Sequence, residues 1–256
     1  MQYEFIKQYY EMQDCKVLAI VECGSRAWRY HRDNSDHDLL VIYKYNLPEY
    51  GLFKKEVVKP HYVAHSYELS QFLQQAFSYK LNTVLYMHAM REKANLYYCT
   101  KKMLGLAQRY TKYFMLERKT TLPILLPQLF GMLHGFAKEY NEAQTVKTYL
   151  RVMHALVLYC NALIMLKCEY DFRFDERFDH NVNLASINDK DLLESAKLVQ
   201  IAQKVALDSL KLGHFSDVKI SLNGIIESLK QVQYETKNSK EVKITSKLVD
   251  LYREVD

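Results

Sequence analysis

A Gly-Ser pair followed by two closely spaced acids is the feature of this sequence best suited to chemistry. Gly24 and Ser25 come shortly after one apolar run, and Asp36 and Asp38 lead into a second. Because side chains alternate across a strand, we expect the two aspartates to point to the same side. Two carboxylates repel each other unless a cation lies between them, and oxygen ligands suit Mg²⁺, which substrate phosphates help to hold. The spacing therefore predicts a Mg²⁺ site, which Mn²⁺ could also occupy.

The Gly-Ser pair supplies a second requirement of phosphate chemistry. A turn at Gly24 and Ser25 can offer backbone N–H groups and a hydroxyl to phosphate oxygens, at the positive end of the short helix expected to follow. Gly-Ser and Asp-x-Asp are each common pairs, so the alternative interpretation is a surface loop with two solvated aspartates. Both pairs in this order, each beside a β-like run, favour phosphoryl or nucleotidyl transfer.

The stretch GSRAWRYHRDNSDHDLLVIY resembles the signature of the DNA polymerase β-superfamily nucleotidyltransferases, Gly-Ser-x-Ala-x-Gly followed by Ser-Asp-x-Asp. Its particular form most resembles the RlaP family, predicted nucleotidyltransferases associated with RNA repair. The resemblance implies that Asp36 and Asp38 are metal ligands and catalytic residues. It also implies that Gly24 and Ser25 bind nucleotide phosphates, and we include Arg26 of the same turn in the nucleotide-binding set.

The sequence departs from the family pattern at two positions. Arg29 stands where the family usually has glycine, so it could give the phosphates a cationic contact or block the usual pose. The third carboxylate of the superfamily is not evident, and Glu68 is the nearest acidic candidate for a metal ligand. The alternative role for Glu68 is to complement the dipole of a helix that begins near Ser70.

Residues 55–66 contain β-branched and aromatic residues around Pro60, which predicts a third strand of the edge type. His61 and His65 are four residues apart in this stretch. Pro60 argues against the helix that would bring the two rings together. We therefore expect both histidines to be surface or packing residues rather than metal ligands.

A second cluster of candidate residues lies more than 100 residues further along the chain. Lys147 and Arg151 are spaced i and i+4 at the start of a strongly apolar helix, so they share one face. Two cations on one face repel unless an anion is present, and a triphosphate would satisfy them. The alternative is that they extend into solvent or pair with acids such as Glu139.

The RlaP family has a helix with His and Ala-Lys or Ala-Arg, followed by Lys-Lys-Tyr-x-Tyr-x-x-Arg. Similar places in this sequence hold His134, Ala137, Lys138, Lys147, Tyr149 and Arg151. The resemblance, which covers roughly residues 15–175 with gaps, implies that Lys138, Lys147, Tyr149 and Arg151 bind the nucleotide from the helical side.

Composition describes an ordered, largely helical protein. Of 256 residues, 49% are hydrophobic and only 7 are glycine and 4 proline, which excludes a disordered class. The net charge of +5 is spread without a dense basic tract, so it is compatible with nucleic acid without indicating it. The 5 cysteines show no CxxC pairing, so we expect neither a disulfide framework nor a zinc site, and a reducing cytoplasmic location.

The longest apolar stretch, residues 152–166, is shorter than the about 20 residues that a bilayer requires, which predicts a buried helix and no membrane partner. The fold class expected is α+β. A small mixed-sheet, polymerase β-like nucleotidyltransferase domain over residues 1–110 precedes an all-helical domain over residues 111–256.

The resemblance implies an enzyme that moves NMP from a nucleoside triphosphate to an acceptor hydroxyl at a two-metal Mg²⁺ site, with RNA as the acceptor. Two alternatives stay open. The acceptor could be a hydroxyl on a protein, or the chain could be an inactive nucleotide- or RNA-binding homologue, because a third carboxylate is not evident.

Overall fold

The structure, a computed structural model, describes residues 3–31, 33, 35–45, 54–91, 95–168, 184–212 and 221–232, with only the backbone described at 54–57 and 186. The chain divides into two compact units, one of residues up to Leu116 and one of Glu117–Asn238. The boundary expected after residue 110 falls inside helix α5 (Lys101–Leu116). No proline or glycine interrupts the helix at residue 110, so α5 continues to Leu116 and the first unit ends there.

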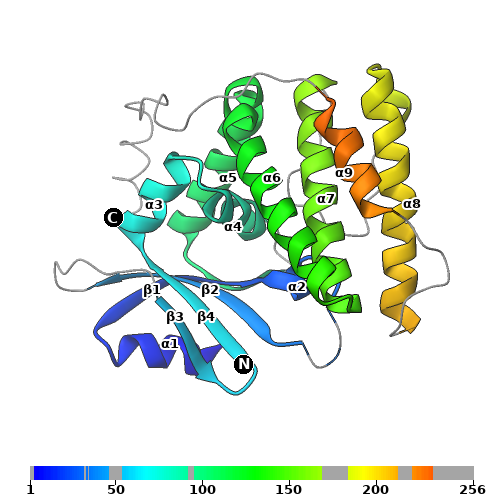
Figure 1. The fold of residues 1–256 in the computed structure, drawn as a ribbon. Coiled ribbons are helices and arrows are strands. Elements are labelled where there is room, and N and C mark those ends of the chain that lie inside the picture. Colours follow the sequence, from blue (N-terminus) through cyan, green and yellow to red (C-terminus); the bar gives the residue numbers. More distant parts are fainter. Residues whose placement is uncertain are drawn as a thin grey trace. The chain divides into compact units, whose positions relative to one another are not determined.

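The first unit is built on a mixed five-stranded sheet in the order β3-β4-β2-β1-β5 (Figure 1). The strands are β1 (Cys15–Cys23), β2 (His37–Tyr45), β3 (Lys54–Lys59), β4 (Tyr62–Glu68) and β5 (Leu96–Cys99). β2 and β4 are parallel, and the other neighbouring strands are antiparallel.

The single strand expected over residues 55–66 is wrong, because this stretch folds as the hairpin of β3 and β4. Pro60 and His61 form the turn between the two strands. Proline cannot donate to a strand ladder, so it suits the turn better than the strand. His61 takes a left-handed φ of 65° there.

Helices cover both faces of this sheet. α1 (Glu4–Glu11) packs Ile6 and Tyr10 on the face that carries Leu39, Val41 and Tyr43. α3 (Leu69–Phe77) and α4 (Leu81–Arg91) lie on the opposite face, and α5 packs against α4 (Figure 1). Because both faces are covered, β1 and β2 are apolar along most of their length.

A bulge in β1 decides which face each later residue occupies. The register with β2 shifts between Val17 and Ala19, so Val17 and Ile20 both pack on the α1 side. An extra residue in one strand reverses the alternation beyond it. Glu22 therefore shares its face with His37, whereas Cys23 faces the side of its register partner Asp38.

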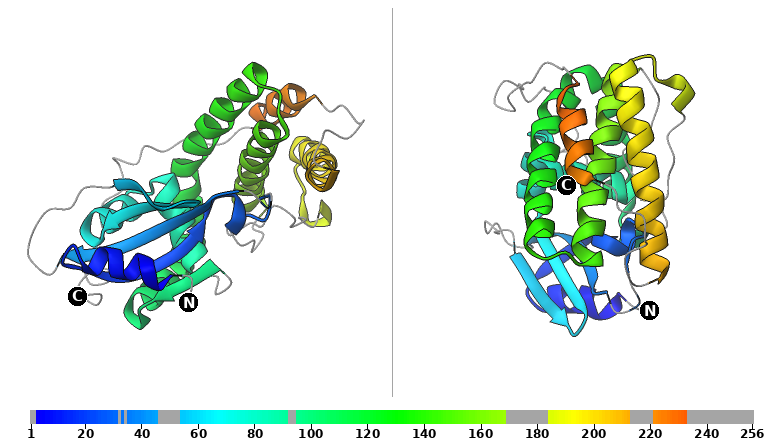
Figure 2. Two further views of the ribbon diagram at one scale, coloured as in Figure 1. Left: turned by 90° about the horizontal axis from the view of Figure 1, so that it is seen from below. Right: turned by 45° about the vertical axis from the view of Figure 1, so that its right-hand side comes forward.

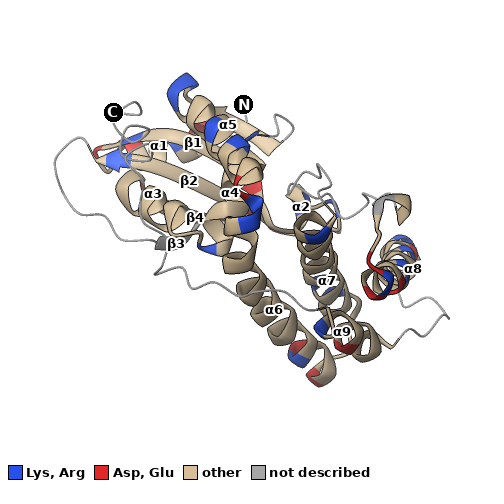
Figure 3. Cartoon of the chain, turned by 90° about the horizontal axis from the view of Figure 1, so that it is seen from above, with Lys and Arg blue, Asp and Glu red and all other residues tan. Residues whose placement is uncertain are grey.

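The second unit is helical. It contains α6 (Arg118–Glu142), α7 (Val146–Lys167), the short η2 (Leu184–Ser186), α8 (Lys190–Leu212) and α9 (Leu222–Lys230). α6, α7 and α8 run side by side with α7 in the middle, and α9 packs against α8 (Figure 2). Figure 3 shows acidic and basic residues interspersed on α8, whereas α7 is mostly uncharged.

Among the described residues, α7 is the one helix long and apolar enough to cross a membrane. However, 89% of its most apolar window is buried inside the structure, as in the core helix of a globular unit. This burial confirms the buried helix expected over residues 152–166. A mixed sheet with helices followed by a helical region also confirms the predicted α+β class.

Candidate functional site

The backbone of Gly24 lies directly against the carboxylate of Asp38. Gly24 opens the single-turn helix α2 (Gly24–Ala27) with φ of +64°, a conformation that favours glycine. A Cβ at this position would overlap the Asp38 carboxylate and stand 2.9 Å from the Cβ of Asp38. The Gly-Ser turn and the second aspartate are therefore one structural unit, although 14 positions separate them in the sequence.

The start of α2 has no side-chain cap. The residue before it, Cys23, makes no capping hydrogen bond, and its Sγ instead donates to the carbonyl oxygen of Asp38 at 3.2 Å. The first N–H groups of any helix have no acceptor inside the helix. The start of α2 thus lies beside the Asp38 carboxylate and has no capping side chain from Cys23.

The end of α2 explains the position of Arg29. The N–H of Tyr30 donates to the Ser25 carbonyl at 3.1 Å and that of Arg29 to the Arg26 carbonyl at 3.2 Å, the two bonds of a Schellman motif. The residue at the left-handed position of this motif is usually glycine, and Arg29 holds it with φ of 62°. Its side chain is exposed.

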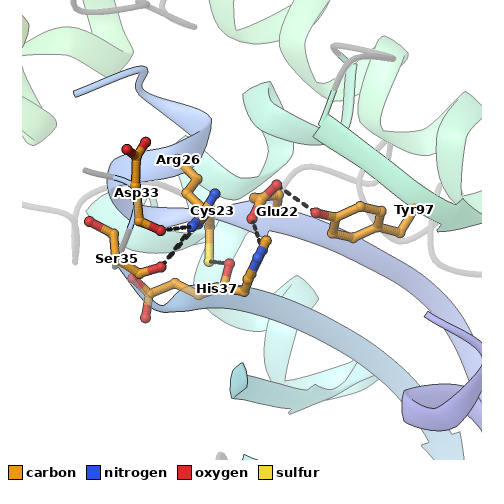
Figure 4. A network of polar contacts seen from close by, with 8 residues as sticks. Glu22, Cys23, Arg26, Asp33, Ser35, His37 and Tyr97 are labelled. Atoms are coloured by element: carbon orange, nitrogen blue, oxygen red, sulfur yellow. Dashed lines mark hydrogen bonds and ion pairs between the residues drawn. The ribbon is translucent and has the colours of Figure 1, made fainter. Parts of the chain in front are cut away.

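Arg26 holds the loop that leads to Asp36. Its Nε and Nη2 donate to the Ser35 carbonyl at 3.2 and 2.9 Å, and Nη2 also donates to the Asp33 carbonyl at 3.4 Å (Figure 4). These bonds direct the guanidinium at protein carbonyls. Arg26, expected to bind nucleotide, instead positions the residue before the first aspartate.

Each aspartate faces a histidine from the β3–β4 hairpin. Asp36 precedes β2, and its Oδ1 is 3.4 Å from Nδ1 of His61, with side chains 59% and 75% exposed. Asp38 lies within β2, and its Oδ1 is 3.5 Å from Nε2 of His65, with side chains 36% and 19% exposed. His61 is thus a surface residue and His65 a half-buried one, in line with the expectation, and the parallel pairing of β4 with β2 brings both to the acids.

A polar network joins four strands on the opposite face of the sheet, the face of His37. Glu22 accepts the Tyr97 hydroxyl on Oε2 at 2.6 Å, and its Oε1 lies 2.7 Å from Nδ1 of His37 (Figure 4). The His37 ring stacks on Tyr62, with centroids 4.6 Å apart and planes 6° from parallel. Burial, followed by the hydrogen bond to Glu22, raises the pKa of Tyr97. The network fixes the residue that stands between the two aspartates.

Two further groups near Asp38 stay neutral. Burial, then the negative charges of Asp38 and Glu22, raise the pKa of the Cys23 thiol well above its usual value. Burial, then the charges of Cys23, Tyr67 and Asp38, raise the pKa of Tyr86 on α4. Both groups are therefore protonated neighbours of the Asp38 carboxylate at neutral pH.

Glu68 is not brought to the aspartates. Its carboxylate accepts the N–H of Ser70 at 2.8 Å and that of Gln71 at 3.4 Å, and also contacts the Ser70 hydroxyl, so it is the N-cap of α3. In the register Glu68 pairs with Tyr43, five residues along β2 from Asp38. At about 3.3 Å per residue this is about 16 Å. The structure supports the helix-capping alternative.

The basic residues predicted on the helical side belong to the second unit and show three different environments. Arg151 forms an ion pair with Glu139 and lies 4.2 Å from the centroid of the Phe136 ring. Lys138 is exposed and lies 4.0 Å from Glu142, and Lys147 is also exposed. Tyr149 is buried against Tyr140, with ring centroids 5.7 Å apart, and burial raises its pKa to about 12.

Asp36 and Asp38 fit a cation only with help from other ligands. Among the described residues, no three His, Cys, Asp or Glu side chains form a ready metal site. Mg²⁺ is commonly bound by one or two carboxylates together with substrate phosphates and water. The donors present fit a cation that arrives with a nucleotide, because Gly24 places an amide-rich turn against Asp38.

Sequence reasoning missed Glu22 and Tyr97. Glu22 had a visible signal, since it is the one acid in the apolar run of β1 and directly precedes Cys23 and Gly24. Tyr97 had none, because 75 positions separate it from Glu22 and only the pairing of β1 with β5 joins them.

No protein-family model matches this chain, and a search of curated proteins finds no match. Among solved structures, a nucleotidyltransferase-like protein from Exiguobacterium sibiricum is similar, with 14% sequence identity and a TM-score of 0.34. The similarity covers 99% of this chain and 73% of that one. Similarity at this level identifies no activity.

Proposed function

We propose that the chain is a divalent-cation-dependent nucleotidyltransferase that moves NMP from a nucleoside triphosphate to an acceptor hydroxyl. One observation carries the proposal. The backbone of Gly24 lies against the carboxylate of Asp38, so a turn suited to phosphate and an acid suited to a cation are adjacent. Neither feature alone would specify the chemistry, because common turns and common acids occur separately.

The residues of this site divide the work of the reaction. The amides of Gly24 and Ser25 and the Ser25 hydroxyl bind the β- and γ-phosphates, which keeps the α-phosphate near the acids. Asp36 and Asp38 hold the cation, in a two-metal Mg²⁺ or Mn²⁺ site. When bound, the cation neutralises phosphate charge and activates the acceptor hydroxyl.

The transfer needs no reactant besides the nucleoside triphosphate and the acceptor hydroxyl. The acceptor oxygen bonds to the α-phosphorus, the bond from that phosphorus to the β-bridging oxygen breaks, and pyrophosphate leaves. The hydroxyl proton passes to solvent or to a carboxylate. Arg26 acts on this step indirectly, because it holds the Ser35 carbonyl and with it the backbone that precedes Asp36.

We take RNA as the acceptor, on the sequence resemblance to the RlaP family. The exposed side chains of Lys138 and Lys147 are the better candidates for anion contacts on the helical unit. Arg151 is already paired with Glu139, and Tyr149 is buried. A protein hydroxyl is the alternative acceptor.

A second candidate function is an inactive nucleotide- or RNA-binding module. It is favoured by the position of Glu68, whose carboxylate caps α3 and does not join the aspartates, so the described part of the chain brings no third acid to them. Binding of nucleotide without release of pyrophosphate would identify this function.

The test is transfer of label from α-phosphate-labelled nucleoside triphosphates with Mg²⁺ or Mn²⁺, in the presence of total RNA and total protein. We expect labelled RNA and released pyrophosphate, and a loss of at least about 100-fold in Asp38→Asn and in Asp36→Asn. Glu4→Gln is the matched control, because Glu4 is an exposed acid on α1 of the same unit. Equal transfer by wild type and both aspartate variants would refute the proposal.

The same experiment separates the acceptors. Label that is sensitive to ribonuclease identifies RNA, and label that is sensitive to protease identifies protein. Retention of labelled nucleotide on filters without any transfer, abolished in Asp38→Asn, would instead support the binding module.

A further inference from the structure

His65 is placed where a third ligand for the cation is needed. β4 runs parallel to β2 with Asp38 opposite Val63 and Leu40 opposite His65. Residues opposite each other and two apart along parallel strands lie on the same face, so His65 shares the face of Asp38. The ring reaches back along the sheet and brings Nε2 to 3.5 Å from the Oδ1 of Asp38.

We propose that His65 binds the divalent cation together with Asp38, in the place of a third carboxylate, and that this nitrogen makes the site favour Mn²⁺ over Mg²⁺. This inference rests on the cation site of the proposed function, and it adds the third ligand and the choice of metal. Asp36, phosphate oxygens and water complete the coordination.

The distance supports shared coordination. Two adjacent ligands of one cation, each about 2.1 Å from it, lie about 3 Å apart. The 3.5 Å between Nε2 and Oδ1 needs only a small side-chain shift to reach this spacing, and it is long for a hydrogen bond. The side chains of His65 and Asp38 are 19% and 36% exposed, so the pair is accessible from solvent but not fully exposed.

The chemistry of imidazole supports the choice of metal. Mg²⁺ prefers oxygen ligands, whereas imidazole nitrogen suits transition metals, and affinity for nitrogen sites rises from Mn²⁺ to Zn²⁺ and Cu²⁺. Mn²⁺ combines tolerance for carboxylate and phosphate oxygen with a greater acceptance of nitrogen. An imidazole in place of an acid also removes one of the oxygen ligands that Mg²⁺ prefers, whereas Mn²⁺ accepts the nitrogen more readily.

Glu68 strengthens this assignment. Its carboxylate is committed to the amides of Ser70 and Gln71, so β4 offers His65 and not an acid beside Asp38. His61 differs from His65 in its surroundings, since it sits in the β3–β4 turn with its side chain 75% exposed. An exposed turn residue has the rotamer freedom that disfavours tight coordination.

The test is pulsed electron paramagnetic resonance of the full chain with Mn²⁺, alone and with a non-hydrolysable nucleoside triphosphate analogue. We expect modulation from a directly bound ¹⁴N nucleus in the wild type, replaced by ¹⁵N coupling when histidine is labelled with ¹⁵N. The isotope experiment needs no variant, so a folding defect cannot obscure it.

Variants assign the nitrogen. His65→Gln should lose the ¹⁴N coupling and weaken Mn²⁺ binding by at least about tenfold, whereas His134→Gln, an exposed histidine on α6, should change neither. His65→Asp should shift preference towards Mg²⁺. Retention of the coupling in His65→Gln, or its loss in His61→Gln alone, would overturn the assignment.

Two failures are distinguishable. Bound Mn²⁺ with no nitrogen coupling in the wild type would overturn the role of His65 and leave the proposed transfer intact. Failure of Mn²⁺ and Mg²⁺ to bind at all, even with nucleotide, would overturn both.

Discussion

The segment from β1 through α2 to β2 and the hairpin of α6 and α7 each gather charged residues, but they satisfy the charges in different ways. At Asp38 the neighbours are a glycine backbone and a half-buried histidine. At Arg151 the neighbours are an acid and an aromatic ring of the adjacent helix. The first arrangement leaves a partly exposed carboxylate, at which we propose a cation binds, and the second already neutralises its cation.

This difference shows why two similar charge patterns in the sequence lead to different environments in the fold. Asp-x-Asp and the Lys147–Arg151 spacing both predicted a repulsion that an outside ion would relieve. In the hairpin, Glu139 on α6 provides the opposite charge internally. In the sheet, the acid at the end of β4, Glu68, caps α3, and the β4 side chain that lies near Asp38 is His65.

The largest effect is expected for Gly24→Ala. The new Cβ would overlap the Asp38 carboxylate, and the alanine would have to adopt a left-handed φ near +64°. We expect a loss of about 2 kcal/mol in the free energy of unfolding and of at least about 100-fold in nucleotidyl transfer. The measurements are denaturant unfolding and label transfer.

Gly131→Ala on α6 is the matched control, because a Cβ there meets nothing within 4 Å. It should stabilise the chain by about 0.5–1 kcal/mol through helix propensity. Wild-type activity in Gly24→Ala would contradict the claim that transfer requires the close contact between Gly24 and Asp38.

The next largest effect is a loss of stability of the helical unit at low pH. Burial on α7 lowers the pKa of His154 to about 3, below the about 6.5 of an unfolded histidine. The unfolded chain then binds more protons below pH 6.5, so stability falls as pH falls from about 6.5 towards 3, at roughly 1 kcal/mol per pH unit.

Urea unfolding at pH 7 and pH 5 measures this prediction. Wild type should lose about 2 kcal/mol more than His154→Leu between the two pH values, because leucine cannot take up a proton. An equal loss in both chains would show that His154 is not the acid-sensitive group of the helical unit.

A smaller effect is expected at Arg29, in the first region. Arg29→Gly should raise the free energy of unfolding by about 1 kcal/mol, because glycine holds a left-handed φ without strain. Arg29→Ala removes the same charge but keeps the strain, so it should bring no such gain. Reduced nucleotide affinity in both variants would identify Arg29 as a cationic phosphate contact, and affinity unchanged in both would exclude that role.

The smallest effect is the coupling between Arg151 and Glu139, whose side chains are 36% and 44% exposed. A double-mutant cycle with alanine should give about 0.5 kcal/mol, decreasing as salt is added. A coupling of zero together with weakened nucleotide binding in Arg151→Ala would place this hairpin in the same class as the Asp38 region.

Local signals in the sequence predicted β2 and the buried helix α7, but not the hairpin of β3 and β4. The apolar run after Asp38 predicted β2, and the encircling apolar residues of 152–166 predicted a central helix, which α7 confirms. Pairing and register were not available locally. The bulge at Val17–Ala19 and the Pro60 hairpin determine which side chains meet Asp38, and neither follows from alternation alone.

By itself, the sequence determined that a glycine, a serine and two acids stand at the ends of neighbouring apolar runs, because short-range patterns specify strands and turns. Only the tertiary structure decided that Glu68 caps a helix, that Arg151 has an acidic partner, and that His65 reaches Asp38. The physical reason is that local sequence patterns do not specify contacts between residues far apart in the chain. A ligand set is formed by side chains from separate strands, and their meeting depends on strand register across the whole sheet.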